Sequence, residues 1–192
     1  MMTITMNASN PVVYRKRLSL VWNYRTDEKW LSDLSAQGLH LTKPGVFRYR
    51  FEQDSSVRYE YRLDYQTIHD AKELETYVAF FEDSGWTLAG SIMGWHYYRR
   101  PYSEGNSAEI YTDRSSLKQL YRRVQFTLAV VAILNLFLLI VNSFNAFRND
   151  DEPVIRNVFI VLMSIQLLAS LLLAYGCVKF QKKIKQIDVP ET

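Results

Sequence analysis

Apolar and polar residues alternate at short intervals in the first hundred residues, whereas two long apolar runs dominate the rest of the chain. Residues 124–147 include 24 consecutive positions without a charge, and residues 157–178 include 22 more. A helix needs about 20 mainly apolar residues to cross a bilayer. Neither run leaves a polar face for water. We therefore expect two transmembrane helices rather than the buried helical hairpin of a soluble protein.

Basic residues are distributed unevenly around the two predicted spans. Lys and Arg number eight in the flanks 114–123 and 179–185, but two in the connector 148–156, which is acidic. This connector is too short to cross the bilayer, so the spans must form an antiparallel hairpin. The positive-inside rule then places both termini in the cytoplasm and the connector outside. The sequence thus predicts a multi-pass protein of the cell membrane.

Two amide side chains interrupt the apolar runs at similar depths. Asn135 lies 11 residues from the start of the first run, and Gln166 lies 12 residues from the end of the second. We expect these two side chains to hydrogen-bond across the hairpin near the middle of the bilayer. Ser170 and Ala174 permit close helix approach, either within one hairpin or, as the alternative, at the seam of a homo-oligomer.

Two similar segments in the front part predict two helices, each followed by a strand. At a constant offset of 47, Gly38 aligns with Gly85, and the apolar residues that precede the two glycines also align. These apolar residues follow helical spacing, and a glycine just past the last turn favours a left-handed cap. Asp27 and Asp70 are the predicted N-caps of the two helices.

Alternation of apolar and charged residues predicts strands between the two helices. The stretches FRYRF (47–51) and VRYEYRLDY (57–65) each place aromatic or aliphatic residues on one face and charged residues on the other. The stretch QDSS between them predicts a turn. We therefore expect a hairpin in which Arg50 lies opposite Glu60, and Glu52 opposite Arg58, on a solvent-exposed face.

The predicted order is a strand around residues 17–22, a helix, three strands, a second helix and two strands. Two helices on one face of a mainly antiparallel sheet fit this order, so the predicted fold class is α+β, with a transmembrane hairpin after it. The predicted boundaries are a disordered N-terminus (1–13), a cytoplasmic α+β domain (14–102), a linker and basic juxtamembrane helix (103–123), transmembrane helices (124–147 and 157–178), an external loop (148–156) and a basic cytoplasmic tail (179–192).

Charge and cysteine content narrow the range of partners. Residues 1–113 carry 13 Lys and Arg against 15 Asp and Glu, a net charge of −2, so the excess of basic residues lies beside the spans. Basic residues at that position face the headgroups of the lipid bilayer, and we expect no nucleic-acid partner. The single cysteine, Cys177, excludes an internal disulfide. It either faces lipid or, as the alternative, is acylated.

Groups suited to catalysis are sparse. The chain has no Gly-rich phosphate loop, no nucleophile elbow and no pair of histidines at metal-ligand spacing. The three histidines, at positions 40, 69 and 96, are scattered, and we expect packed or surface side chains rather than ligands. We accordingly expect no catalytic residue, no cofactor and no metal, and we do not expect an enzyme.

Aromatic residues are concentrated in the front part of the chain. All four Trp and 11 of the 13 Tyr precede residue 114. Most of them are expected to form the core. The alternative is an aromatic groove for a peptide or small ligand, with Trp86, Trp95 and Tyr97 at or beside it.

Several stretches resemble a bacterial family known as domain of unknown function number twenty-eight-twelve. They are EKWLSDLSAQGLHL, FRYRFE, YEYRLDY, YVAFFEDSGWTLAGSIMGWHYYRRP and EIYTD, and they span about residues 15–115. The resemblance implies a membrane-anchored cytoplasmic domain, of a kind often encoded beside PadR-type transcription regulators. It carries over no catalytic residues.

The leading hypothesis is a membrane protein whose cytoplasmic domain binds a protein partner or small ligand as a regulatory or stress-linked accessory. The rival hypothesis is a non-signalling membrane accessory or assembly subunit that acts through its transmembrane hairpin. A partner that needs only the front domain would favour the first hypothesis, and one that needs only the hairpin would favour the second.

Overall fold

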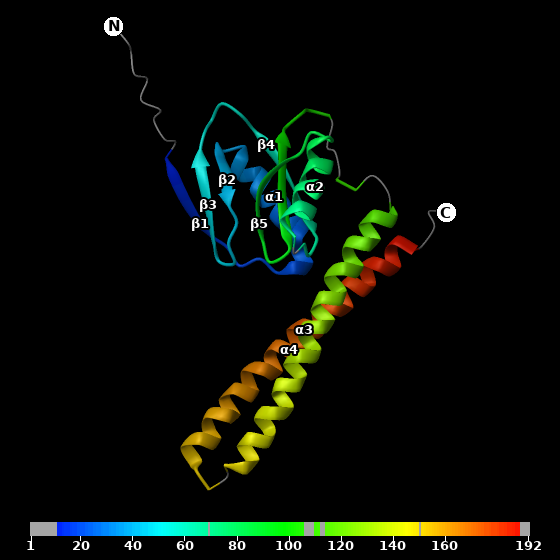
Figure 1. Ribbon diagram of the computed structural model, residues 1–192. Coiled ribbons are helices and arrows are strands. Elements are labelled where there is room, and N and C mark those ends of the chain that lie inside the picture. Colours follow the sequence, from blue (N-terminus) through cyan, green and yellow to red (C-terminus); the bar gives the residue numbers. More distant parts are fainter. Residues whose placement is uncertain (1–10, 69, 106–109, 112–113, 150, 189–192) are drawn as a thin grey trace. The chain divides into compact units, whose positions relative to one another are not determined.

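A computed structural model of the chain describes residues 11–68, 70–105, 110–111, 114–149 and 151–188. The chain divides into two compact units, Met1–Thr112 and Asp113–Thr192. We call them the α+β unit and the hairpin unit, and both are seen in Figure 1. The predicted fold class, α+β followed by two long apolar helices, is confirmed.

The α+β unit contains six strands and two α-helices among its described residues. Their order is the predicted one, with a strand and a helix followed by three strands, and then a helix followed by two strands. The elements are β1 (Val12–Lys16), the 3-10 helix η1 (Val21–Asn23), α1 (Tyr24–Ser35), β2 (Leu39–Lys43), β3 (Arg48–Gln53), β4 (Tyr59–Tyr65), α2 (Ala71–Glu82), β5 (Thr87–Ile92) and β6 (Trp95–Pro101).

The strands form two antiparallel sheets with the same topology. One sheet has the order β1-β3-β2, and the other has the order β4-β6-β5. In each sheet the third strand along the chain lies between the first and the second. The α+β unit is therefore built from two β-α-β-β copies, each with its own sheet and its own helix (Figure 1).

The offset of 47 relates far more of the two copies than the helix ends. Helix α1 begins 47 residues before α2 and ends 47 residues before it, and β1, β2 and β3 begin 47 residues before β4, β5 and β6. Even the irregularities in strand pairing match, because the register shifts between Leu41 and Lys43 in β2 and between Leu88 and Gly90 in β5. The two copies therefore share backbone geometry as well as sequence spacing.

The predicted hairpin between β3 and β4 is wrong. Strand β3 pairs with β1 and β2, whereas β4 pairs with β6, so residue Glu60 lies opposite Arg100 rather than Arg50, and Glu52 lies opposite Val12 and His40 rather than Arg58. Alternation reveals which side chains share a face of a strand, but it carries no information about which strand is the neighbour.

The charged face of β4 is not solvent-exposed as expected. Glu60 and Asp64 are buried, and Arg62 is partly buried. Apolar side chains cover one face of this strand and a polar network covers the other, so charged residues alternate with apolar ones without marking a face in contact with water.

The first strand and one predicted helix cap also differ from expectation. Strand β1 begins at Val12, inside the segment expected to be disordered, and residues 21–23 form the short helix η1 instead of a strand. Residues 1–10 lie outside the described residues. Asp27 lies within α1 rather than before it, and its carboxylate accepts from Arg17 Nε at 2.7 Å. Asp70 is the N-cap of α2, as predicted, and accepts from Lys72 N at 2.9 Å.

Aromatic side chains dominate the core of the α+β unit. Tyr49 from β3 and Tyr97 from β6 meet with their ring centroids 6.4 Å apart, which joins the two sheets. The Tyr61 hydroxyl on β4 accepts from Leu41 N on β2 at 3.0 Å, a second link between the sheets. Residues with fully buried side chains include Tyr49, Tyr61, Tyr98, Phe51, Leu31 and Leu41.

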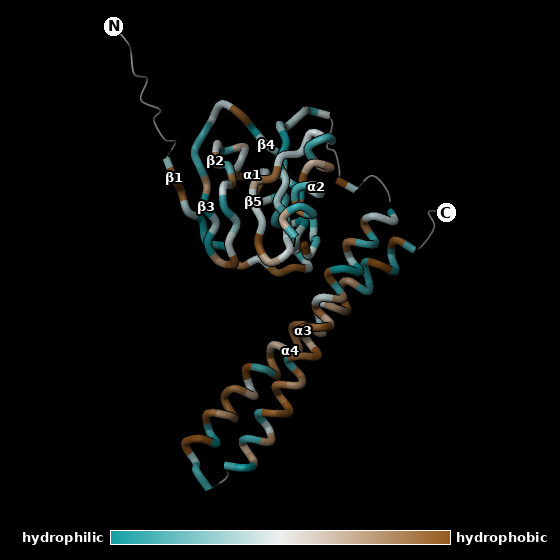
Figure 2. The backbone as a smooth tube through the Cα atoms, viewed as in Figure 1, coloured by the Kyte–Doolittle hydropathy of each residue, from teal (hydrophilic) through white to brown (hydrophobic). Residues whose placement is uncertain are grey.

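The hairpin unit consists of α3 (Arg114–Arg148) and α4 (Pro153–Asp188). Both helices are long and apolar enough to cross a membrane. Only 6% of the most apolar window in α3 and 0% of that in α4 is buried, so these are not the core helices of a soluble fold. Figure 2 shows the apolar middle portions of both helices and their more polar ends.

Candidate functional site

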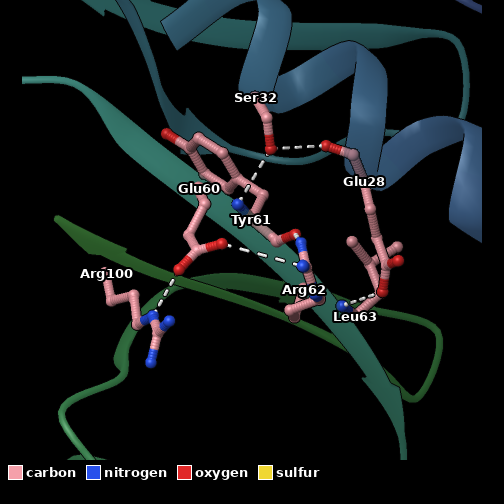
Figure 3. A network of polar contacts seen from close by, with 7 residues as sticks. All are labelled: Glu28, Ser32, Glu60, Tyr61, Arg62, Leu63 and Arg100. Atoms are coloured by element: carbon pink, nitrogen blue, oxygen red, sulfur yellow. Dashed lines mark hydrogen bonds and ion pairs between the residues drawn. The ribbon is translucent and has the colours of Figure 1, made fainter. Parts of the chain in front are cut away.

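Helix α1 covers the edge of β4 that does not pair with β6 (Figure 3). Three side chains on one face of α1 accept from successive outward-facing amides of β4. Tyr59 N donates to Ser35 Oγ at 2.7 Å, Tyr61 N to Ser32 Oγ at 3.0 Å, and Leu63 N to Glu28 Oε1 at 2.9 Å. Helical spacing of residues 28, 32 and 35 matches every second residue of the strand. The helix therefore satisfies a sheet edge that would otherwise be open for pairing.

Glu60 is a buried carboxylate compensated by two arginines. Its Oε1 accepts from Arg100 Nε, and its Oε2 lies 3.6 Å from Arg62 Nη2 (Figure 3). The Arg100 guanidinium also lies over the Trp86 ring, 4.8 Å from its centroid. A buried carboxylate needs such pairing because desolvation strongly disfavours an isolated charge.

Asp64 is a second buried carboxylate, and it joins three segments that are distant in sequence. Its oxygens accept from the hydroxyls of Tyr77 on α2 and Tyr111 in the segment that leads to α3, and from Tyr65 N at 2.7 Å. On the neighbouring strand β6, His96 lies opposite Asp64. This cluster ties the helix of the second copy to the last described residues of the α+β unit.

Two histidines hold equivalent hydrogen-bond arrangements in the two sheets. His40 Nε2 lies 2.7 Å from Asp54 O and its Nδ1 lies 3.0 Å from Ser35 Oγ. Because a carbonyl can only accept, Nε2 carries the proton, and Nδ1 accepts from the serine hydroxyl. His96 likewise bridges a carbonyl, Gln66 O at 3.0 Å, and a serine, Ser91 Oγ at 2.8 Å.

The serine of the first arrangement is already fully engaged. Ser35 Oγ donates to His40 and accepts from Tyr59 N, so its lone pair and its proton both have fixed partners. The two histidines are thus packed connectors between backbone segments, as the sequence suggested. The third histidine, His69, lies outside the described residues.

The three aromatic residues predicted beside a groove are all buried. Trp86 is 3% exposed, Trp95 7% and Tyr97 4%. Trp86 packs with Phe81 and Tyr98, and the Trp95 ring lies 5.2 Å from that of Tyr65. Burial raises the pKa of the Tyr97 hydroxyl above its ordinary value. These contacts favour the interpretation of the three residues as core and leave them little surface for a partner.

The polar residues of the hairpin unit pair differently from the prediction. Asn135 and Gln166 do not bond to each other, because Asn135 Oδ1 accepts from Ser170 Oγ at 2.8 Å and Gln166 Oε1 accepts from Asn142 Nδ2 at 3.0 Å. The expected pairing is displaced by four residues, about one helical turn. Equal depth from the ends of the apolar runs was a poor guide, because both helices extend beyond those runs.

Ser170 contacts the other helix of the same chain, which supports the packing of this small residue within one hairpin. Near the basic end of the unit, Gln125 Nε2 donates to Cys177 O at 3.3 Å and to Gln181 Oε1 at 2.9 Å. The Cys177 thiol is partly buried.

Sequence reasoning missed Glu28, Glu60 and Asp64 as buried polar groups. Each lies in a pattern that normally marks a water-facing surface, and its partners are remote in sequence. The one available signal was the excess of Tyr and Arg over what a small core needs, because these are the donors that the buried carboxylates use.

The arrangement defines a class of protein, a β-α-β-β repeat domain followed by two apolar helices. The chain matches a family described as "Protein of unknown function (DUF2812)" over residues 23–133, more than half of its length, and it belongs to that family. The match continues from α1 through β6 into the first half of α3. No curated protein and no solved structure shows significant similarity to the chain.

Proposed function

We propose that the protein is a two-span protein of the cell membrane, with both termini in the cytoplasm, whose α+β unit recognises a protein partner in a regulatory role. The observation that carries this proposal is the exposed apolar surface of α3 and α4, which water would not tolerate and a bilayer would cover. The orientation follows from the basic residues, eight beside the free ends of the hairpin against two in the connector.

The Asp64 cluster supports a regulatory role for the α+β unit. Tyr77 on α2 and Tyr111 before α3 donate to the same carboxylate. Ile110 also packs against the buried cluster of Phe81, Trp86 and Tyr98. A partner that displaces α2 would therefore disturb the contacts of the segment that continues into the hairpin unit. In this proposal the α+β unit recognises its partner and does not catalyse a reaction.

The topology can be tested with single cysteines in a Cys177→Ser background. Ser103 and Asp151 are both exposed, one before α3 and one in the connector. A membrane-impermeant thiol reagent applied to intact cells should label Asp151→Cys, and it should label Ser103→Cys only after the cells are opened. Labelling of Ser103→Cys in intact cells would reverse the orientation. Equal labelling of both sites would exclude a hairpin that spans the membrane.

The recognition role can be tested by capture of partners from native membranes. Two tagged forms are compared with the full chain, one in which an unrelated two-span hairpin replaces residues 124–178 and one that lacks residues 11–112. Partners kept by the first form and lost by the second support recognition by the α+β unit. The opposite result would favour the rival function, an accessory subunit that acts through its hairpin.

A further inference from the structure

One end of the α+β unit carries most of its large exposed apolar side chains. The β2–β3 and β5–β6 turns occupy equivalent places in the two copies, and each presents such a residue at its tip. Phe47 is 63% exposed and Met93 is 79% exposed. Leu18, in the segment between β1 and η1, is 64% exposed. Isolated exposed apolar residues are ordinary, but a cluster of large ones at one end of a domain marks an interaction surface.

These residues lie together in the fold. Arg17 N donates to Phe47 O at 3.2 Å, which places the Leu18 segment beside the β2–β3 turn. Figure 1 shows this segment and both turns at the same end of the unit, and Figure 2 shows the apolar backbone segments gathered there. We call Leu18, Leu20, Val46, Phe47 and Met93 the apolar tip.

Met93 is not explained by the geometry of its own turn. Met93 and Gly94 both have positive φ angles, +50° and +80°, as a tight hairpin turn requires. Asn, Asp or Gly would adopt the first of these conformations at lower cost, and a polar residue would suit water better. An apolar side chain in this place is accounted for if it enters an apolar environment.

The sheet beside the apolar tip has an unusual concentration of positive charge. Lys16 lies opposite Arg48, and Lys43 lies opposite Arg50, so two like-charged pairs face each other across neighbouring strands. Like charges in directly opposite positions destabilise a sheet. Neither segment 12–20 nor segment 43–50 contains an acidic residue, although the first 113 residues have a net negative charge. The charge pattern is complementary to an anionic surface.

We propose that the apolar tip docks on the anionic leaflet of the bilayer, with its apolar side chains at the boundary of headgroups and acyl chains and its Lys and Arg residues at lipid phosphates. This mode of binding combines buried apolar area with attraction between basic residues and anionic lipids. The proposal rests on the membrane insertion proposed above and adds a second, peripheral contact made by the α+β unit.

The connection to the hairpin unit favours this occupant over a free protein or nucleic acid. The chain leaves the α+β unit after Tyr111, which is tied to Asp64, and Asp64 lies opposite His96, three residues from Met93. Only two residues separate Tyr111 from the start of α3 at Arg114. A tether this short holds the α+β unit close to the membrane, at a high effective concentration of lipid surface.

The test uses the full chain in nanodiscs that hold one copy each, in a Cys177→Ser background. An environment-sensitive fluorophore is attached to Met93→Cys or, as the matched control, to Ser55→Cys, an exposed position in the β3–β4 connection at the other end of the unit. The discs contain either phosphatidylcholine alone or an equal mixture with phosphatidylglycerol, and a fraction of the lipids carries a shallow quencher. A label at Leu138→Cys, on an exposed face of α3, reports hairpin insertion separately.

Docking predicts a blue shift and strong quenching at position 93 in anionic discs, weaker effects in neutral discs, and neither effect at position 55. Each basic residue near an anionic leaflet favours binding by about fivefold. The double variant Lys16→Gln/Lys43→Gln should therefore lower the ratio of docked to undocked molecules by about 25-fold. The control variant Lys29→Gln/Lys72→Gln, at two exposed lysines of α1 and α2, should leave that ratio unchanged.

Equal signals at positions 93 and 55 in anionic discs, with Leu138→Cys quenched, would overturn the docking proposal and leave the membrane hairpin intact. Absence of quenching at Leu138→Cys would overturn both proposals. Quenching at position 93 that appears only in discs holding two copies would assign the apolar tip to an interface between chains and would also overturn the docking proposal.

Discussion

Gly38 and Gly85 lie at equivalent ends of α1 and α2, with φ angles of +78° and +81°. The left-handed caps expected from the offset of 47 are therefore present in both copies. Their surroundings differ. A Cβ added to Gly38 would lie 2.8 Å from Ser55 Oγ and 3.2 Å from Asp54 O, whereas one added to Gly85 would have no neighbour within 4 Å.

Both Gly→Ala substitutions should destabilise the α+β unit, and Gly38→Ala should cost more. A residue with a Cβ in the left-handed conformation costs roughly 1–2 kcal/mol, and this applies at both sites. Only Gly38→Ala adds a clash with the backbone of the β3–β4 connection. All four Trp lie in the α+β unit, so their fluorescence during denaturation of the full chain in detergent reports this unit. Equal losses for the two variants would contradict the difference in crowding.

The Tyr98→Phe substitution should stabilise the α+β unit by about 1 kcal/mol. Tyr98 is 0% exposed, and its hydroxyl has no hydrogen-bond partner among the described residues. A buried hydroxyl without a partner costs roughly 1–3 kcal/mol of desolvation, which phenylalanine avoids at nearly the same volume. The matched variant is Tyr61→Phe, which should lose about 1 kcal/mol because Leu41 N then lacks its acceptor. Denaturant midpoints at pH 7 that fall for both variants would refute this assignment.

The same tyrosine should make stability sensitive to alkaline pH. Burial raises the pKa of Tyr98, and the negative charges of Asp64 and Glu82 raise it further. The folded state then keeps a proton that the unfolded chain releases near its ordinary pKa of about 10. This contribution to stability is complete below about pH 10 and is lost as the pH rises toward the folded-state pKa.

Tyr98→Phe should therefore reduce the slope of unfolding free energy against pH above about pH 10, by up to about 1.4 kcal/mol per pH unit. The buried residues Tyr61 and Tyr97, whose pKa values are also raised by burial, should preserve the rest of the slope. Tyr102→Phe, at a half-exposed position, serves as the control and should leave the slope unchanged. The slopes come from urea titrations at closely spaced pH values.

The repeated elements were accessible from sequence because helix and strand periodicity is a local property. The offset of 47 showed at the two glycines, and the structure extends it to every strand of both copies. Sheet order was not accessible. The alternation in residues 57–65 is compatible with pairing to either neighbour, and only the packing of α1 on one edge of β4 excludes β3.

The polar network was hidden for a related reason. Asp27 looked like a helix cap because it precedes an apolar helical pattern, yet α1 starts three residues earlier and Asp27 pairs with Arg17. Glu60 and Asp64 looked solvated because they alternate with apolar residues. In each case the partner that permits burial lies at least ten residues away, beyond the reach of a local pattern.

Glu28→Ala should destabilise the α+β unit more than Glu28→Gln does. The Glu28 carboxylate accepts from Leu63 N at 2.9 Å, and alanine would leave this buried amide without an acceptor, at a cost of roughly 1–3 kcal/mol. Glutamine keeps a carbonyl oxygen at the same reach. Hydrogen exchange at the Leu63 amide should accelerate strongly in the alanine variant and only slightly in the glutamine variant. Unchanged exchange in both variants would show that α1 does not protect this edge of β4.

The register of the hairpin unit can be checked by coupling energies between its polar residues. Gln166 accepts from Asn142, and Asn135 accepts from Ser170. Double-mutant cycles with Asn142→Leu and Gln166→Leu, and with Asn135→Leu and Ser170→Ala, should each give a coupling of about 0.6–2 kcal/mol in a bilayer or bicelle. The cycle that joins Asn135 to Gln166 provides the contrast, because these residues are one turn out of register and should couple by less than about 0.3 kcal/mol.

These three cycles separate two packings of the same helices. If the helices slid by one turn, so that Asn135 faced Gln166, the third cycle would show the coupling and the first two would lose it. A seam between two chains would make the Asn135–Ser170 coupling depend on protein concentration, because Ser170 would then bond to the partner chain. Coupling in the first two cycles that does not change on dilution is the result expected for a hairpin whose small residues pack within one chain.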